Sequence, residues 1–168
     1  MNGFDRELRT RILGMVSQAS VGSNTILPNW REISESIKQD PDVLATAPYT
    51  QSQGMLTANG QVAGSVITGI DPTLEQQVSI IGKHLTSGSL TPLTSGSFTI
   101  VLGQNLADSL GLLVGDKVTL VLPEASLSAA GVVPRFKRFT VVGTFTIGAD
   151  VDGLMAFIPL NDAARILR

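Results

Sequence analysis

The chain has 168 residues and a mass of 17.7 kDa, enough for one compact domain or for two small lobes that share a boundary. Only 15% of the residues are charged, below the roughly 25% typical of soluble domains, so we expect another molecule to cover part of the surface. The net charge of −2 argues against nucleic-acid binding, and the absence of cysteine excludes disulfide and thiolate chemistry.

The N-terminal part is predicted to contain two helices. Apolar residues at helical spacing predict an amphipathic helix over residues 2–13, with its stripe continued at residue 15: Phe4, Leu8, Ile12 and Met15. A short strand is expected over residues 19–21. A second helix is expected to begin with Asn29 as a candidate N-cap and to end at Asp40-Pro41, because proline cannot continue the helical hydrogen bonds. Its buried stripe is expected to consist of Trp30, Ile33 and Ile37.

The middle of the chain is predicted to be a β-hairpin followed by irregular structure. Strands are expected over residues 43–58 and 61–70, joined by a tight turn at Asn59-Gly60. A short helix over residues 73–81 follows. Residues 86–97 are rich in Ser, Thr, Gly and Pro, which is the composition of a loop.

The C-terminal part is predicted to combine strands with two short helices. The expected elements, in order, are a strand over residues 98–102, a helix over 104–110, strands over 117–122, 138–147 and 155–159, and a helix that begins at Asn161. A long connection separates the strands at 117–122 and 138–147. Its residues 125–133 carry no charge, and three basic residues follow closely: Arg135, Lys137 and Arg138.

No convergent set of catalytic residues is visible in the sequence. The single histidine, His84, has no Asp, Glu or Cys close to it, and the GADVDG segment with Asp150 and Asp152 lacks the spacing of a calcium loop and is predicted to be a turn. A phosphate-binding P-loop, a GxSxG nucleophile motif and an apolar run long enough to span a membrane are all missing from the sequence. We therefore expect a binding or mechanical module that is not an enzyme and that uses no cofactor or metal.

Several segments, in order, resemble the LolC/LolE-type membrane subunits of lipoprotein-releasing ABC transporters, which belong to the MacB/FtsX-like superfamily. The matching segments are NGFDRELRTRILGMV, PNWREISESIKQDPDVLATAPY, VITGIDP, IVLGQNLADSLGLLVGDKVTLVLP, VVGTF and DGLMAFIPLNDAARIL. The resemblance covers almost the whole chain. It combines features of the LolC and LolE branches, as a LolF-like subunit would.

The resemblance implies an α+β fold of the MacB-like periplasmic core, in a periplasmic domain of a bacterial inner-membrane protein. Such a core has a Porter-like βαβ lobe with an inserted, β-rich Sabre-like lobe. We expect residues 1–70 and 150–168 to form the Porter-like lobe and residues 71–149 the Sabre-like lobe. The C-terminal part of the Porter-like lobe is expected to be missing after Arg168, which would expose a strand edge near residues 155–158 and favour self-association.

The resemblance also implies a hook hairpin at residues 123–138 that engages a LolA-type periplasmic chaperone. The residues expected at the hook tip are Leu127, Ala129, Ala130, Gly131, Val132, Val133 and Pro134. The residues expected in a basic pad at its base are Arg135, Lys137 and Arg138. A thin apolar tip can enter an apolar cavity without burying a charge, and basic residues at the base can meet an acidic rim.

The expected function is therefore that of a permease domain that helps extract lipoproteins from the inner membrane and passes them to the chaperone. The other expected partners are outer-membrane lipoproteins, a second permease subunit and a LolD-type ATPase. The alternative is a structural or gating lobe that recruits no chaperone. A third class, an enzyme built on a cradle-like β-barrel, rests only on the LGLLVGDKVTL pattern.

Overall fold

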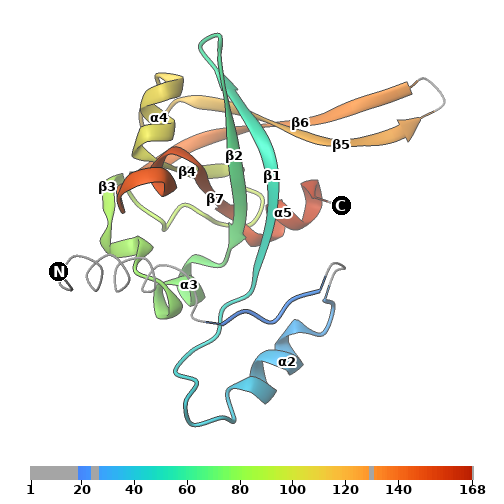
Figure 1. The fold of residues 1–168 in the computed structure, drawn as a ribbon, viewed down its shortest axis with the longest axis vertical. Coiled ribbons are helices and arrows are strands. Elements are labelled where there is room, and N and C mark those ends of the chain that lie inside the picture. The colour runs from blue at the N-terminus through green and yellow to red at the C-terminus, as the bar shows by residue number, and fades with distance from the viewer. Residues whose placement is uncertain (1–18, 24–26, 129–130, 168) are drawn as a thin grey trace, which may run out of the picture.

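The computed structural model describes residues 19–23, 27–128 and 131–167, and its centre is a closed β-barrel (Figure 1). The strands are β1 (Tyr49–Ala58), β2 (Gln61–Ile70), β3 (Leu85–Gly88), β4 (Thr99–Gly103), β5 (Lys117–Ser128), β6 (Gly131–Phe145) and β7 (Met155–Pro159). Around the ring the order is β1, β2, β7, β4, β6, β5, and β5 pairs again with β1. The short strand β3 adds to β6 outside the ring.

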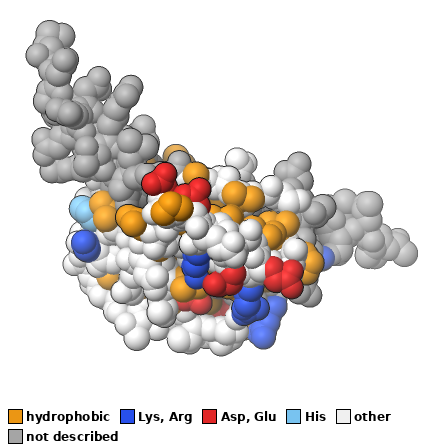
Figure 2. Space-filling view, turned by 90° about the horizontal axis from the view of Figure 1, so that it is seen from below, with side chains coloured by type: hydrophobic (Ala, Val, Ile, Leu, Met, Phe, Trp, Pro, Cys, Tyr) orange, Lys and Arg blue, Asp and Glu red, His pale blue; other side chains and the backbone are white. Residues whose placement is uncertain are grey.

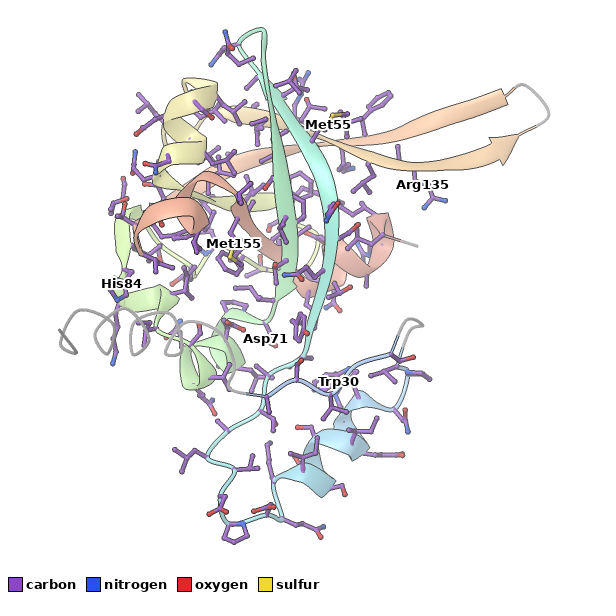
Figure 3. The ribbon with its side chains drawn as sticks, in the orientation of Figure 1. Trp30, Met55, Asp71, His84, Arg135 and Met155 are labelled. Atoms are coloured by element: carbon purple, nitrogen blue, oxygen red, sulfur yellow. The ribbon has the colours of Figure 1, made fainter. Side chains whose placement is uncertain are left out.

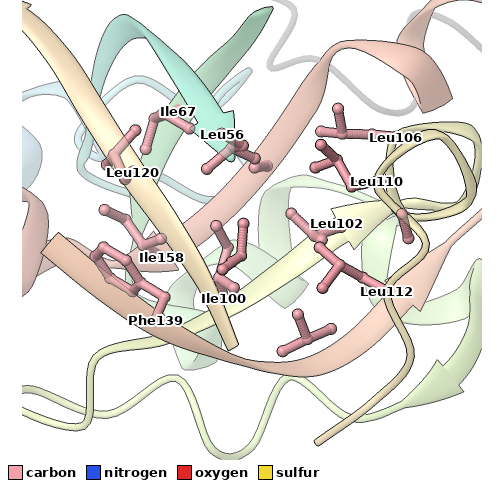
Figure 4. Packing of buried hydrophobic residues seen from close by; sticks show 14 of the residues in the cluster. Leu56, Ile67, Ile100, Leu102, Leu106, Leu110, Leu112, Leu120, Phe139 and Ile158 are labelled. Carbon is pink, nitrogen blue, oxygen red and sulfur yellow. The ribbon is translucent and has the colours of Figure 1, made fainter. Parts of the chain in front are cut away.

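The long strand β6 closes the ring by changing partners along its length. Up to Thr140 it pairs with β5, and from Thr140 to Phe145 it pairs in parallel with β4. Strand β1 alternates buried and less buried positions over its second half, whereas β4 is buried at all five positions, so side chains of these strands fill the packed interior of the barrel. Buried side chains from the strands and from the helix at residues 104–110 form one of two core clusters (Figure 4), which includes Leu56, Ile67, Ile100, Leu102, Leu106, Leu110, Leu120, Phe139 and Ile158.

The helices in the described part of the chain are short. They are α2 (Trp30–Ile37), α3 (Pro72–Val78), α4 (Gln104–Leu110) and α5 (Leu160–Ile166), with 3₁₀ turns η1 (Ile81–Lys83) and η2 (Ala149–Gly153). Together with the strands they confirm the expected α+β class. The predicted bounds of α4, β2 and β7 agree with the structure.

The β1–β2 hairpin turns at Asn59 and Gly60, which both have positive φ angles of 53° and 76°. This is the backbone that a two-residue hairpin turn requires, so the predicted Asn-Gly turn is confirmed. The Asn59 Nδ2 also donates to the carbonyl oxygens of Leu110 (3.0 Å) and Gly111 (2.9 Å), at the C-terminal end of α4. The hairpin tip therefore holds α4 over the barrel.

Helix α5 packs on β2 at a glycine. A Cβ at Gly69 would lie only 2.4 Å from the Cβ of Ala163, so no other residue at this position would let α5 approach so closely. The same added Cβ would lie 2.9 Å from the Cγ2 of Thr50, the residue opposite Gly69 on β1. This contact places the first turn of α5, with its buried Asp162, against the barrel.

The segment before the barrel, as far as the structure describes it, buries no residue. Helix α2 forms as predicted, but its Asn29 makes no side-chain cap, and its stripe of Trp30, Ile33 and Ile37 is only half-buried. Seen from the α2 side, the surface carries apolar side chains among the charged ones (Figure 2), and Leu44 is 98% exposed. The strand expected over residues 19–21 is not formed, and the helix expected over residues 2–13 lies outside the described residues.

The expected lobe boundaries at 70/71 and 149/150 do not interrupt the sheet. Strands β1, β2 and β7 lie in the same closed ring as β4, β5 and β6, because β2 pairs with β7 and β7 pairs with β4. The expected open strand edge near residues 155–158 is wrong for the same reason: β7 has a neighbour on each side. Its Ala156, Phe157 and Ile158 are buried.

Two further differences concern strand lengths. Residues 86–88, expected in a loop, belong to β3, which pairs with residues 143–145 of β6. The strand expected over residues 43–58 begins only at Tyr49.

Candidate partner-binding hairpin

The strands β5 and β6 form a hairpin whose outer half projects from the barrel (Figure 1). Their pairing runs from Lys117 opposite Thr140 to Ser128 opposite Gly131. The neighbouring strand β1 pairs with β5 only over residues 119–121. We call residues 123–134 the arm, of which the structure describes 123–128 and 131–134; their strands pair only with each other. The long connection predicted from the sequence is therefore a two-stranded ribbon.

A bulge separates the arm from the barrel part of the hairpin. Leu122 lies opposite Arg135 and Ser126 lies opposite Val133, so three residues of β5 face a single residue of β6. The residues at this step include Pro123 and Pro134, and proline has no N–H to donate to a strand ladder. Bulges bend a strand and increase its twist, so this step sets the direction of the arm.

The residues expected at the hook tip lie on the two facing strands of the arm. Leu127 lies opposite Val132, and Gly131 lies opposite Ser128. Val133 lies opposite Ser126, with Pro134 in the bulge next to it. Ala129 and Ala130 lie outside the described residues.

The three residues of the expected basic pad are all exposed on β6, directly after the arm. Arg135 projects from the hairpin where it leaves the barrel (Figure 3), and Arg138 lies opposite Thr119. The Nζ of Lys137 lies 3.8 Å from the centre of the Phe98 ring, a cation–π contact. The pad is thus brought together on one strand, with Lys137 fixed against the barrel.

Phe98 is held in an unusual backbone conformation by a buried carboxylate. Its φ is 48°, a left-handed value that few residues with large side chains adopt. The Asp162 carboxylate accepts from the N–H of Gly96 (2.6 Å) and of Phe98 (3.0 Å). The Phe98 ring also packs edge-on against Phe139, 5.9 Å between centres. Asp162 and Phe98 therefore position the ring under Lys137.

Sequence reasoning missed three residues of this region: Phe98, Asp162 and Phe136. Phe136 lies between the basic residues and is 70% exposed. An aromatic residue among strand positions that otherwise carry charge was a usable signal for an exposed Phe136. Asp162 reaches groups 64 and 66 residues away in the chain, and no local pattern marks such a contact.

The structure places the other candidate residues apart from one another. His84 ends the 3₁₀ turn η1, and the Asp152 carboxylate accepts from the N–H of Ile147 (2.8 Å) and Gly148 (3.1 Å). The GADVDG segment is therefore a turn, as predicted. Within residues 19–23, 27–128 and 131–167, no three His, Cys, Asp or Glu residues gather as metal ligands, and no helix is long and apolar enough to cross a membrane.

Comparison with known proteins gives relatives along the whole chain. It is 38% identical over 171 residues to the lipoprotein-releasing system transmembrane protein LolC of Neisseria meningitidis, and 23% identical over 172 residues to LolE of Haemophilus influenzae. These alignments include 100% and 99% of this chain. The chain spans about two fifths (41%) of the length of each relative.

Solved structures show the same fold at low sequence identity. The periplasmic region of MacB from Actinobacillus actinomycetemcomitans aligns with a TM-score of 0.51 at 15% identity, over 79% of this chain and 56% of that one. The extracellular domain of the noncanonic ABC-type transporter YknZ from Gram-positive bacteria aligns with a TM-score of 0.57 at 14% identity, over 81% and 65%. The expected architecture of a MacB-like core is therefore confirmed.

The family model described as the MacB-like periplasmic core domain matches residues 2–168. This match and the similarity to LolC and LolE confirm the resemblance and the expected periplasmic location. The chain belongs to the family of MacB-like periplasmic core domains.

Proposed function

We propose that the chain is the periplasmic domain of a permease subunit in a lipoprotein-releasing ABC transporter, and that its arm recruits a LolA-type chaperone. In the whole transporter it would act with a second permease subunit and a LolD-type ATPase to pass outer-membrane lipoproteins to that chaperone. The similarity to LolC supports the first statement. The role proposed for the domain is binding, without catalysis or a cofactor.

The observation that carries the chaperone proposal is the arm itself. Among the described residues its two strands pair only with each other, and a two-stranded ribbon is marginally stable in water without further contacts. The arm sequence from residue 125 to 134 carries no charge, which suits an apolar cavity. The basic pad at its root suits an acidic rim and would speed the encounter.

The test is direct binding of a purified LolA-type chaperone to the immobilised domain. Val133→Asp adds a charge to the arm and is expected to weaken binding at least about fivefold, since truncated or disrupted anchors cost about 1–4 kcal/mol. Leu44→Asp is the matched control, because Leu44 is 98% exposed and lies on the α2 side of the molecule. Binding that survives Val133→Asp, or that falls only because the variant melts early, removes the arm from the mechanism.

The basic pad is tested by measuring the rates of chaperone association and dissociation. Reversing Arg135 and Lys137 to Glu is expected to slow association more than it speeds dissociation, whereas Lys83→Glu, a reversal at an exposed lysine outside the hairpin, is expected to change little. The wild-type association rate is expected to fall as salt rises, because steering is screened beyond roughly 8–10 Å at physiological ionic strength. A domain that captures no chaperone at any salt concentration favours the alternative, a gating lobe.

A further inference from the structure

A small surface cavity lies beside β3, on the side of the barrel away from the arm. Strand β3 pairs with residues 143–145 of β6, at the end of that strand farthest from the arm. Figure 3 shows the same separation between His84, which directly precedes β3, and Arg135. The cavity has a volume of about 270 Å³, and its lining comes from α3, η1, β3 and the turn after β3.

The less exposed part of the lining is apolar, and a glycine keeps space open next to it. Leu90 is buried and Leu85 is half-buried. A Cβ added at Gly82 would lie 3.5 Å from the Cγ of Gln76 and 3.6 Å from the Cδ1 of Leu90. These are ordinary contact distances, so position 82 accepts a side chain, and that side chain would occupy part of the cavity.

The polar side chains of the lining offer hydrogen-bond donors. The Ser89 Oγ accepts from the N–H of Thr91 (3.0 Å) and donates to the Thr91 Oγ1 (3.0 Å). The hydroxyl hydrogen of Thr91 must therefore go to another acceptor, and no described residue supplies one. The Lys83 ammonium also has no hydrogen-bond or ion-pair partner within the described part of the chain. The side-chain amide of Gln76 is a third donor.

The charge on the cavity is positive. No lining residue is acidic, and residues 76–107 contain one lysine, one histidine and no Asp or Glu. Glu75 precedes Gln76 on α3, but it does not line the cavity. An ammonium group beside neutral donors, without a carboxylate, favours an anionic ligand.

We propose that this cavity binds the phosphate group of a small phosphate ester. The Lys83 ammonium supplies the point charge that phosphate sites often use, and Thr91 and Gln76 donate to the other oxygens. The volume of about 270 Å³ lies just below the roughly 300–1,000 Å³ of pockets for drug-sized ligands, which suits a phosphate on a short stem such as glycerol. Leu85 and Leu90 contact the carbons of that stem. Next to an inner membrane, glycerol phosphate is present both as a free ester and as the headgroup of phospholipids.

Titration of the domain with glycerol phosphate, followed through amide NMR shifts, tests the site. Residues 82–84 and 89–91 are expected to respond. Lys83→Met is expected to weaken binding at least about fivefold and Lys83→Arg less, because hydrogen bonds to charged groups are the stronger ones. Lys38→Met is the control, since Lys38 is an exposed lysine on the α2 side whose charge is paired with Glu35 (3.1 Å). An equal response to sodium chloride or sodium acetate at the same ionic strength, or an unchanged response in Lys83→Met, overturns the proposal.

Gly82→Asp blocks the cavity without removing a donor. Its side chain brings bulk and negative charge to a position that tolerates a Cβ, so the response to glycerol phosphate is expected to disappear while the melting temperature stays near that of wild type. A folded Gly82→Asp variant that still binds glycerol phosphate as wild type does places the ligand elsewhere and overturns the site.

Sedimentation with phosphatidylglycerol vesicles distinguishes the two sources of the ester. The net charge of −2 does not by itself attract the domain to this anionic surface. Sedimentation that both Lys83→Met and Gly82→Asp reduce supports the site with a lipid headgroup as its ligand, and a response to glycerol phosphate without sedimentation supports it with a free ester. No response to glycerol phosphate, with or without sedimentation that the variants leave unchanged, overturns the site. The proposed function then still stands, because neither measurement involves the chaperone or the arm.

Discussion

The barrel and the arm share the strands β5 and β6, and the described core lies in the barrel. Strand β5 also pairs with β1 at residues 119–121, β6 also pairs with β4 from Thr140 onward, and residues such as Leu120 and Phe139 are fully buried. Between these points the two strands pair only with each other. One hairpin thus contains a part that packs in the core and a part available for binding. Substitutions in the first part should lower stability much more than substitutions in the second.

The largest effect is expected in the barrel half. Phe139→Ala removes a ring that is 1% exposed and packs against Phe98, and should lower the free energy of unfolding by about 3–5 kcal/mol. Val132→Ala, in the arm, should change it by less than about 0.5 kcal/mol. Urea denaturation of both variants measures the difference. Equal losses would mean that the arm is part of the cooperative fold.

Asp162→Asn is expected to have the next largest effect on the free energy of unfolding. It removes the charge that accepts the N–H groups of Gly96 and Phe98, and hydrogen bonds to buried charged groups contribute about 1.5–3 kcal/mol. Asp108→Asn, at an exposed aspartate, is the control. If Asp162→Asn lowers the free energy of unfolding no more than the control does, Phe98 keeps its left-handed backbone conformation without the carboxylate.

The contact between Lys137 and Phe98 should contribute less to stability than the hydrogen bonds of Asp162. It lies where the barrel and the arm meet. A double-mutant cycle with Lys137→Met and Phe98→Leu is expected to give a coupling energy of about 0.5–1 kcal/mol, as for exposed cation–π pairs. The same two single variants should slow chaperone association to a similar extent if Phe98 positions the ammonium. A coupling energy of zero would mean that Phe98 does not hold Lys137 against the barrel.

The smallest effect concerns α3, away from the hairpin. Burial raises the pKa of Glu75 above its ordinary value of 4.5, so the folded state binds the proton more readily than the unfolded state. The ionised carboxylate therefore counts against folding at pH 7, and this penalty disappears as the pH falls below 4.5. The melting temperature of Glu75→Gln should be slightly above that of wild type at pH 7 and equal to it at pH 4. Chaperone binding should be unchanged. A variant that melts lower at pH 7 contradicts this assignment.

The parts of the fold that local patterns describe were predictable. Strands β2 and β7 follow from alternation and short apolar runs, and the turn at Asn59 follows from the backbone preference of Asn-Gly. Strand β3 was not predictable, because residues 86–88 are Thr, Ser and Gly and become a strand only by pairing with β6. The closure of the barrel depends on β6 exchanging β5 for β4 at Thr140, a long-range event with no local signature.

The candidate site also has a part that the sequence predicts and a part that it does not. The position of the hairpin and its basic pad followed from charge and from the resemblance, whereas the length of the strands did not, because they were expected to end at residue 122 and to resume only at 138. The bulge accommodates Pro123 and Pro134 within the ribbon. Phe98 and Asp162 act through contacts between distant segments, and these appear only in the folded chain.

The bulge with its two prolines also bears on whether the arm can pair with copies of itself. A ribbon of two strands has two free backbone edges, and each edge is a template to which a strand of another chain can add. Neither Pro123 nor Pro134 can offer an N–H to an incoming strand, and the uneven spacing between Leu122 and Ser126 gives that strand no regular ladder to follow. The arm can therefore stay extended for its partner while resisting edge-to-edge aggregation with its own copies.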